Sequence, residues 1–260
     1  MAIKFKDVYY KDVINKVSFD IKMEKINSIV GCNGSGKSTL IQLLCMLKSP
    51  TKGKVLFDNT YKIGLVSQQV EEQLFCETVE DELKSNLESF NYTKEKLDKK
   101  IKDALKMVEL DLDILKRDPL KISSSEMRKL SLAKALSINP QILILDEPCI
   151  GLDMKEKETV IRILQKLKRR YSKTIIIVTN DIELVHLVSD NIIGISNGKV
   201  LCIGNKYSFF KKVDLLKKNK IAVPKIIEFE DNVLRKKKIK LGYRDDINDL
   251  IKDILRNAKK

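Results

Sequence analysis

Residues 31–39 read GCNGSGKST, a run of glycines and small polar residues that ends on a lysine and two hydroxyl side chains. The run matches the pattern G-x-x-x-x-G-K-[ST] in full and lies between a strand-like segment and a helical one, where a phosphate-binding loop must lie. In such a loop backbone amides approach phosphate oxygens, Lys37 brings a positive charge, Ser38 can ligate Mg²⁺, and the helix N-terminus adds about half a positive charge. The residues predicted to hold a nucleoside triphosphate here are Gly31, Cys32, Asn33, Gly34, Ser35, Gly36, Lys37, Ser38 and Thr39.

A pair of neighbouring carboxylates follows a second strand-like segment, ILILDEP at 142–148. Asp146 comes at the carboxyl end of four apolar residues, where an aspartate can hold Mg²⁺ through water. Glu147 comes next and is placed to orient and polarise a water that attacks the terminal phosphate. An acidic turn after a strand carries little meaning by itself, but together with residues 31–39 it predicts binding and hydrolysis of ATP with Mg²⁺.

Composition excludes several classes of protein. The chain has 260 residues, 43% of them hydrophobic, which suits one large domain or a domain with an appendage. Its five cysteines form no CxxC pair, so we expect reduced thiols and neither zinc nor a disulfide framework. The net charge of +14 comes overwhelmingly from lysine, and the densest run, at 235–240, has the apolar spacing of a solvated helix face. We therefore expect no nucleic-acid partner.

The first residues, MAIKFKDVYY, lack the apolar core of a signal peptide. No apolar run approaches the ~18 residues that would span a bilayer. We expect the chain to stay in the cytoplasm and to reach a membrane only through partners.

The elements that must position these groups alternate between strands and helices. From about residue 78 to 136 the pattern is helical throughout, which predicts a helical subdomain, over about 70–137, inserted into a parallel α/β core. Strands are predicted at 3–9, 17–21, 26–30, 55–57, 62–66, 142–146, 174–179 and in the segments IIGIS and KVLCIG, and helices at 37–47, 155–170 and 181–189. After residue 205 the periodicity weakens, and a last helix is predicted over about 246–257.

Together GCNGSGKST, LILDEP and GLD at 151–153, in this order and spacing, resemble the ATP-binding subunits of ABC transporters. The gap between the first two motifs is too short for the long coiled coils of the chromosome and DNA-repair ATPases that share them. The resemblance implies a P-loop NTPase fold of the ABC type, with a RecA-like parallel core, an N-terminal β subdomain and the inserted helical subdomain. We assign the ATP-binding domain to 1–205 and a small helical extension, with possible dimer contacts, to 206–260.

Finer likeness is to the energy-coupling factor ATPases, which serve importers of vitamins or metal ions. GLVSQQVEEQLFCETVEDEL at 64–83 resembles their Q-loop region, and SSSEMRKLSLAKAL and LLKKNKIAVPKI resemble two further stretches. This likeness implies that Gln68, with Gln69 as second candidate, touches both Mg²⁺ and the attacking water. An aromatic residue near the N-terminus would stack on adenine, with Tyr10 as the candidate and Tyr9 as the alternative.

The family mechanism that the resemblance implies needs partners. Two ATP-binding subunits dimerise head to tail, and each ATP lies between the phosphate loop of one subunit and the signature motif of the other. Integral membrane subunits respond to closure of this dimer, so the chain is expected on the cytoplasmic face of the membrane as a peripheral subunit.

The signature motif departs from the usual L-S-G-G-Q, because residues 121–129 read KISSSEMRK. Ser123 aligns with the serine, Ser124 and Ser125 replace both glycines, and Glu126 replaces the glutamine. Ser123 and Glu126 also have the spacing of a capping box at a helix start. At an effective dielectric of about 20, a carboxylate about 6 Å from a phosphate charge is repelled by roughly 3 kcal/mol. A capping box that holds Glu126 toward its own helix would lessen this repulsion.

A second departure is Asn180 in TIIIVTND, where the family has a histidine that contacts the γ-phosphate and the attacking water. Asparagine donates a hydrogen bond but carries no proton or charge at neutral pH. Asn180 weakens the site on this chain's own loop, whereas the altered signature weakens the partner's site, so we favour a heterodimer. The alternatives are a regulatory subunit with little hydrolysis, a soluble ABC protein acting on ribosomes or DNA, and a degenerate copy.

Overall fold

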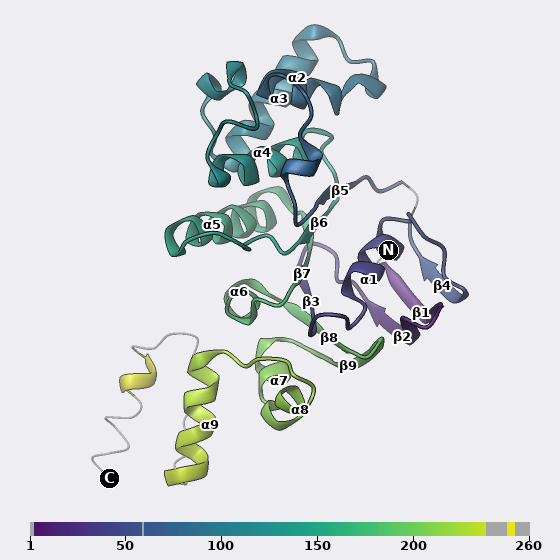
Figure 1. The fold of residues 1–260 in the computed structure, drawn as a ribbon, viewed down its shortest axis with the longest axis vertical. Coiled ribbons are helices and arrows are strands. Elements are labelled where there is room, and N and C mark those ends of the chain that lie inside the picture. The colour runs from purple at the N-terminus through teal and green to yellow at the C-terminus, as the bar shows by residue number, and fades with distance from the viewer. Residues whose placement is uncertain (1–2, 59, 238–248, 253–260) are drawn as a thin grey trace.

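The computed structural model describes residues 3–58, 60–237 and 249–252, and Figure 1 shows them as two sheets with helices between and around them. The smaller sheet is antiparallel, with the order β2-β1-β4. Its strands are β1 (Lys4–Tyr10), β2 (Ile14–Asp20) and β4 (Lys52–Leu56). This sheet is the N-terminal β subdomain that the sequence predicted.

The larger sheet has the order β5-β6-β7-β3-β8-β9. Its strands are β3 (Ile26–Val30), β5 (Ile63–Val66), β6 (Ile142–Asp146), β7 (Thr174–Thr179), β8 (Asn191–Ser196) and β9 (Lys199–Gly204). The pairs from β5 to β8 are parallel, and β9 joins β8 as an antiparallel edge. The predicted parallel α/β core is therefore confirmed.

Alternating residues of the central strands enter two separate cores. In β7, Ile176 and Val178 pack with α1 (Lys37–Leu44) and the small sheet, whereas Ile175 and Ile177 pack on the side of α5 (Met154–Tyr171) and α6 (Ile182–Val188). Burial on both faces explains the continuous apolar run of β7, TIIIVT. Helix α1 ends three residues before the predicted position, and Met46 just beyond it has a left-handed φ of 54°.

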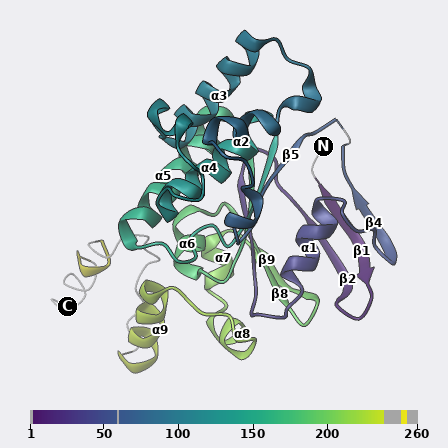
Figure 2. The same cartoon turned by 45° about the horizontal axis from the view of Figure 1, so that its top comes forward.

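The residues between β5 and β6 form a helical group at one end of the molecule, opposite α8 and α9 in both views (Figures 1 and 2). It contains α2 (Val79–Ser85), α3 (Lys94–Val108) and α4 (Ser124–Ser137) with the 3₁₀ turns η1 (Glu71–Gln73), η2 (Glu88–Phe90) and η3 (Leu112–Lys116). Helix α3 buries Ile101, Ala104, Leu105 and Val108, which lie on one face because they recur every three or four residues.

The segment after β9 continues as α7 (Lys206–Phe210), α8 (Val213–Lys218) and α9 (Lys225–Lys237). Phe209 and Phe210 are fully buried in one cluster with Val30 of β3, so α7 is anchored to the large sheet. Only the end of α9 was predicted, as part of the helix face at 235–240, although Pro224 just before the helix is a common start signal. Of the predicted helix at 246–257, only 249–252 are described, and they are helical; residues 238–240 of the lysine run also lie outside the described part. Where the chain is described, no helix is both long and apolar enough to cross a membrane.

Candidate functional site

The carboxyl ends of four neighbouring strands bring the predicted groups to one edge of the large sheet. In the order β5-β6-β7-β3, these strands lead into Gln68, Asp146, Asn180 and the loop at 31–36. Ligands of open α/β sheets bind at this edge. A cavity of about 370 Å³ lies here, and its lining residues are Val13, Asn33, Gly34, Gly36, Lys37, Ser38, Thr39, Gln68, Asp146 and Glu147.

The loop has the backbone of a phosphate cradle. Gly34 and Gly36 have left-handed φ angles of 76° and 105°, and a Cβ on Gly36 would lie 2.8 Å from Ile14 Cδ1. A Cβ on Gly31 would lie 2.3 Å from the carbonyl oxygen of Ile195, so the residue that follows β3 lies tightly against the backbone of β8. The buried Ser35 Oγ has no hydrogen-bond partner among the described residues. A close glycine turn with an unused polar atom fits a bound phosphate group.

Lys37 is held over the loop by its own backbone. Its Nζ donates hydrogen bonds to the carbonyl oxygens of Gly31 at 2.7 Å and Cys32 at 3.0 Å. Burial lowers the pKa of Lys37 from its ordinary value, while the acidic groups around it, Glu147 first, act in the opposite direction. A half-buried cation of this kind is stabilised by anionic oxygens, which phosphate groups supply.

Asp146 and Glu147 are adjacent carboxylates at the end of β6. Burial raises the pKa of Asp146, Glu147 raises it further by repulsion, and Lys37 opposes both. A divalent cation would relieve this repulsion, and Ser38, Gln68 and Asp146 offer the oxygen ligands that Mg²⁺ prefers. Within the described ranges no group of three or more His, Cys, Asp or Glu side chains is arranged to hold a metal ion. The residues therefore fit a Mg²⁺ that takes its remaining ligands from phosphate and water.

The Glu147 carboxylate is fixed by the end of β7. Thr179 Oγ1 donates to its Oε2 at 2.6 Å, and the backbone N–H of Asn180 donates to its Oε1 at 2.9 Å. Glu147 also has a left-handed φ of 47°, which is uncommon for a residue other than glycine and recurs at functional sites. Both observations indicate a carboxylate that is held in one orientation.

Asn180 joins the end of β7 to the loop. Its Nδ2 donates to Asn33 Oδ1 at 2.5 Å, so the residue that stands where the family has histidine lies beside the phosphate cradle. It is not among the residues that line the cavity. Gln69 does not line it either, whereas Gln68 does, and the catalytic roles of all three stay predictions.

Tyr10 lies at the end of β1 and is not among the lining residues of the cavity. Lys48 Nζ and Lys11 Nζ lie 5.3 and 5.6 Å from the centre of its ring. Val13, in the turn between β1 and β2, lines the cavity instead. The sequence analysis did not identify Val13, because one apolar residue in a hairpin turn carries no chemical signal. Stacking of Tyr10 on adenine stays a prediction.

The altered signature lies at the N-terminus of α4, away from the cavity lining. The predicted capping box is present, because Ser123 Oγ accepts from the Glu126 amide at 3.2 Å and Glu126 Oε2 accepts from the Ser123 amide at 2.9 Å. Arg117 Nη1 also lies 3.1 Å from Glu126 Oε1. The hydrogen bonds from Ser123, aided by Arg117, hold the pKa of Glu126 below its ordinary value. The carboxylate is thus charged and drawn toward its own chain.

Ser124 and Ser125 form the first turn of α4, with Ser124 exposed and Ser125 half-buried. A site completed by another molecule needs such an accessible position. Nucleotide binding by Ser123, Ser124, Ser125 and Glu126 stays a prediction.

Comparison with known proteins agrees with this geometry. The ABC transporter family matches residues 14–150. The chain is 32% identical to the energy-coupling factor transporter ATP-binding protein EcfA2 of Clostridium perfringens, over 85% of this chain and 82% of that protein. The structure of cbiO1 from Clostridium perfringens, described as part of the ABC transporter complex cbiONQ, has a TM-score of 0.75 and 26% identity, covering 88% of this chain and 98% of that one. A dimeric ATP-binding cassette, MJ0796, in a post-hydrolysis state bound to ADP and Pi, has a TM-score of 0.69 and 30% identity, covering 78% and 98%.

The tight passage at Gly31 gives a first prediction. In Gly31→Ala the new methyl meets the backbone of Ile195, so we expect the free energy of unfolding to fall by about 1–3 kcal/mol. The control is Gly34→Asn, at a left-handed φ with open space around it, where asparagine is tolerated and the loss should stay below about 1 kcal/mol. Urea denaturation measures both, and equal losses would contradict the packing described here.

Proposed function

We propose a specific role for this chain, which belongs to the ABC transporter family: it is an ATP-binding subunit that couples MgATP binding and hydrolysis to import of a vitamin or metal ion in an energy-coupling factor-type transporter. The observation that carries this proposal is the cavity that Lys37, Asp146, Glu147 and Gln68 share at the edge of the sheet. The likeness to EcfA2 over most of both chains supports the energy-coupling factor type.

In this proposal each group has a role that its surroundings support. The loop amides and Lys37 bind phosphate oxygens, and Ser38, Gln68 and Asp146 hold Mg²⁺, which supplies charge neutralisation at the phosphates. Glu147 orients water and accepts its proton, with its carboxylate held by the Thr179 hydroxyl and by the backbone N–H of Asn180. Gln68 helps to place the same water, and Asn180 donates a hydrogen bond near the terminal phosphate.

We further propose that the chain works in a head-to-tail heterodimer on integral membrane subunits, at the cytoplasmic face. Two similar proteins support an assembly, since MJ0796 is dimeric and cbiO1 is part of a transporter complex. Heterodimerisation rests on the two departures from the family pattern. Asn180 belongs to this chain's own site, whereas Ser123–Glu126 would face the partner's nucleotide, so a homodimer would carry both weaknesses at both sites.

A second function, regulatory nucleotide binding with little hydrolysis, is favoured by one contact. The Asn180 side chain is engaged with Asn33 of the loop, and an amide there does not take up a proton. Against this reading, Lys37, Asp146 and Glu147 are all present at the cavity.

The proposal predicts a defined set of partners. A tagged chain recovered from detergent-solubilised native membranes should bring down a second ATP-binding subunit and membrane proteins with several spans, which mass spectrometry identifies. Recovery of ribosomes or nucleic acid at physiological salt, without membrane proteins, would overturn the transport function.

Glu147→Gln tests hydrolysis separately from binding. The amide keeps the shape and an acceptor oxygen but takes no proton, so we expect MgATP affinity within about twofold of wild type and phosphate release slower by about 100-fold or more. Glu158→Gln, at an exposed position of α5, is the control. Unchanged turnover in Glu147→Gln would remove Glu147 from the mechanism and favour the regulatory function.

Asn180→His tests the second departure. Histidine can hold a proton near the terminal phosphate, so turnover of the assembled complex is expected to rise by about tenfold, a smaller gain than the roughly 10²–10⁴-fold that a positioned acid or base typically contributes. The measurement is steady-state phosphate release from the purified complex. Turnover at or below the wild-type rate would show that Asn180 does not limit hydrolysis.

A further inference from the structure

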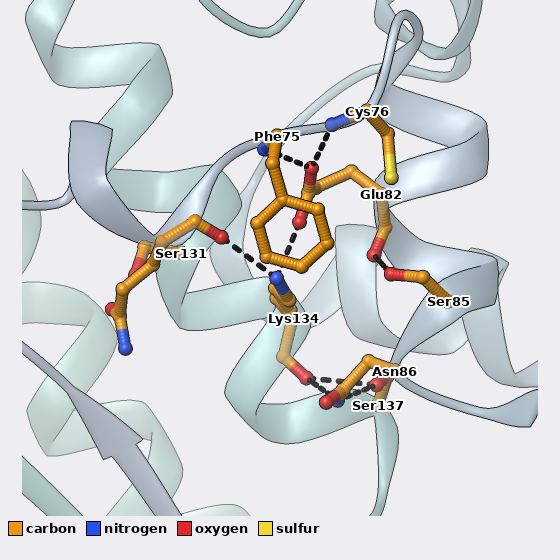
Figure 3. A network of polar contacts seen from close by, with 9 residues as sticks. Phe75, Cys76, Glu82, Ser85, Asn86, Ser131, Lys134 and Ser137 are labelled. Carbon is orange, nitrogen blue, oxygen red and sulfur yellow. Dashed lines mark hydrogen bonds and ion pairs between the residues drawn. The ribbon is translucent and has the colours of Figure 1, made fainter. Parts of the chain in front are cut away.

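A buried ion pair joins the segment after β5 to helix α4. Glu82 of α2 is fully buried, and its carboxylate pairs with Lys134 of α4 (Figure 3). Glu82 Oε2 also accepts hydrogen bonds from the amides of Phe75 and Cys76, both at 2.9 Å. One carboxylate therefore satisfies a cation on α4 and two backbone groups of the segment that follows Gln68.

Lys134 makes two further contacts with the same segment. Its Nζ donates to the carbonyl oxygen of Gln73 at 2.7 Å and lies 4.4 Å from the centre of the Phe75 ring, a cation–π distance. Burial would raise the pKa of Glu82, but the hydrogen bonds from Lys134 and from the amides of Cys76 and Phe75 outweigh it and hold that pKa below its ordinary value. The Glu82 carboxylate is thus charged, and it has several hydrogen bonds in place.

Helix α4 holds the segment at three points along one face. Arg128 Nη1 donates to the carbonyl oxygen of Gln68 at 3.2 Å, and Ser131 Oγ donates to Gln73 Oε1 at 3.1 Å. With Lys134 these residues are three apart, so they share a side of the helix. Gln73 Oε1 also accepts from the Ser67 amide at 3.1 Å. The backbone on both sides of Gln68 is therefore attached to α4.

The attachment extends to α2. Asn86, the residue that ends α2, donates to the Lys134 carbonyl oxygen at 2.7 Å and lies 3.1 Å from Ser137 Oγ. On the side of β5, a cavity of about 120 Å³ separates the network from the strand, and Gly64, Leu65, Ser131 and Lys134 are among its lining residues. Hydrogen bonds thus hold the segment to the helices, and α4 also packs on β5, since a Cβ on Gly64 would lie 2.8 Å from the Ala135 carbonyl oxygen.

We propose that Lys134 is a positioning residue that makes residues 67–76 and α4 one rigid body, so that a contact which fixes Gln68 also sets the position of Ser123–Glu126 at the start of α4. The inference rests on the proposed function, because it requires MgATP to engage Gln68. Lys134 itself touches neither the cavity at the loop nor the start of α4. It acts through the segment that it holds.

Hydrogen exchange of the full chain with and without MgATP tests this transmission. In wild type, MgATP should slow exchange in residues 67–76 and also change it in residues 122–130. In Lys134→Met the slowing of exchange in residues 67–76 should remain. The change in residues 122–130 should fall by at least about fivefold, which is the lower limit of typical coupling between two sites. MgATP affinity should stay within about twofold.

Two variants serve as controls. Lys129→Met removes another lysine of α4, whose Nζ donates to the Glu109 carbonyl oxygen at 3.4 Å and not to the segment, so both responses should persist. Lys134→Arg keeps a cation and should restore the second response. If Lys134→Met does not fold because Glu82 is left charged and buried, Glu82→Gln/Lys134→Met removes that charge and is measured instead.

Each result decides between the proposals. A wild-type chain that binds no MgATP overturns the proposed function, and this inference with it. A wild-type chain that binds MgATP without a response at 122–130, or a Lys134→Met chain with the full response, overturns the rigid-body inference alone. If Lys129→Met also lost the change in exchange at 122–130, the loss would be a general effect of altering α4, and the role of Lys134 would be overturned.

Discussion

The charge balance around Lys37 is the constraint on which the site depends. Asp146 and Glu147 are neighbours, and burial and the nearby Glu147 charge both raise the pKa of Asp146, whereas nearby positive charge lowers it. Lys37 supplies that charge, yet burial lowers its own pKa, and two loop carbonyl oxygens hold its ammonium group. The sheet order brings these groups together, because β6 and β3 both end at the same edge with β7 between them. A bound phosphate would bring negative charge to Lys37, and Mg²⁺ would bring positive charge to the two carboxylates.

Hydrogen bonds and a nearby positive charge also explain how a carboxylate is tolerated in the altered signature. A free Glu126 about 6 Å from a phosphate would repel it by roughly 3 kcal/mol. In the fold, Ser123 and Arg117 occupy both oxygens of Glu126 and draw the side chain to the base of its own helix. Arg117 comes from the turn before α4, so a cation accompanies the added negative charge. The added negative charge is therefore compensated within the chain.

Local patterns predicted the groups that depend on neighbouring residues. The loop at 31–39, the carboxylates after β6 and the capping box at Ser123 each follow from a few consecutive residues, and the buried strands follow from apolar runs. Val13, Arg117 and the Glu82–Lys134 pair were not predicted, because each gains its role from a residue that the fold brings close. In the sequence Lys134 is one lysine within a helical pattern. The helix face predicted at 235–240 overlaps the end of α9, whereas the first turns of α9 were not identified although their apolar residues recur at helical spacing.

The Glu82–Lys134 pair is better explained by position than by stability. A buried ion pair gains little net free energy, because removing both charges from water offsets their attraction, and apolar replacements are often as stable or more so. Such a pair demands a geometry, however, since a displaced partner leaves a buried charge that costs about 3–5 kcal/mol. Here the geometry involves the last turn of α4, the carbonyl oxygen of Gln73 and the adjacent amides of Phe75 and Cys76. An apolar contact would permit these parts to slide, whereas the ion pair permits one arrangement, and that arrangement keeps Gln68 and the start of α4 in fixed relation.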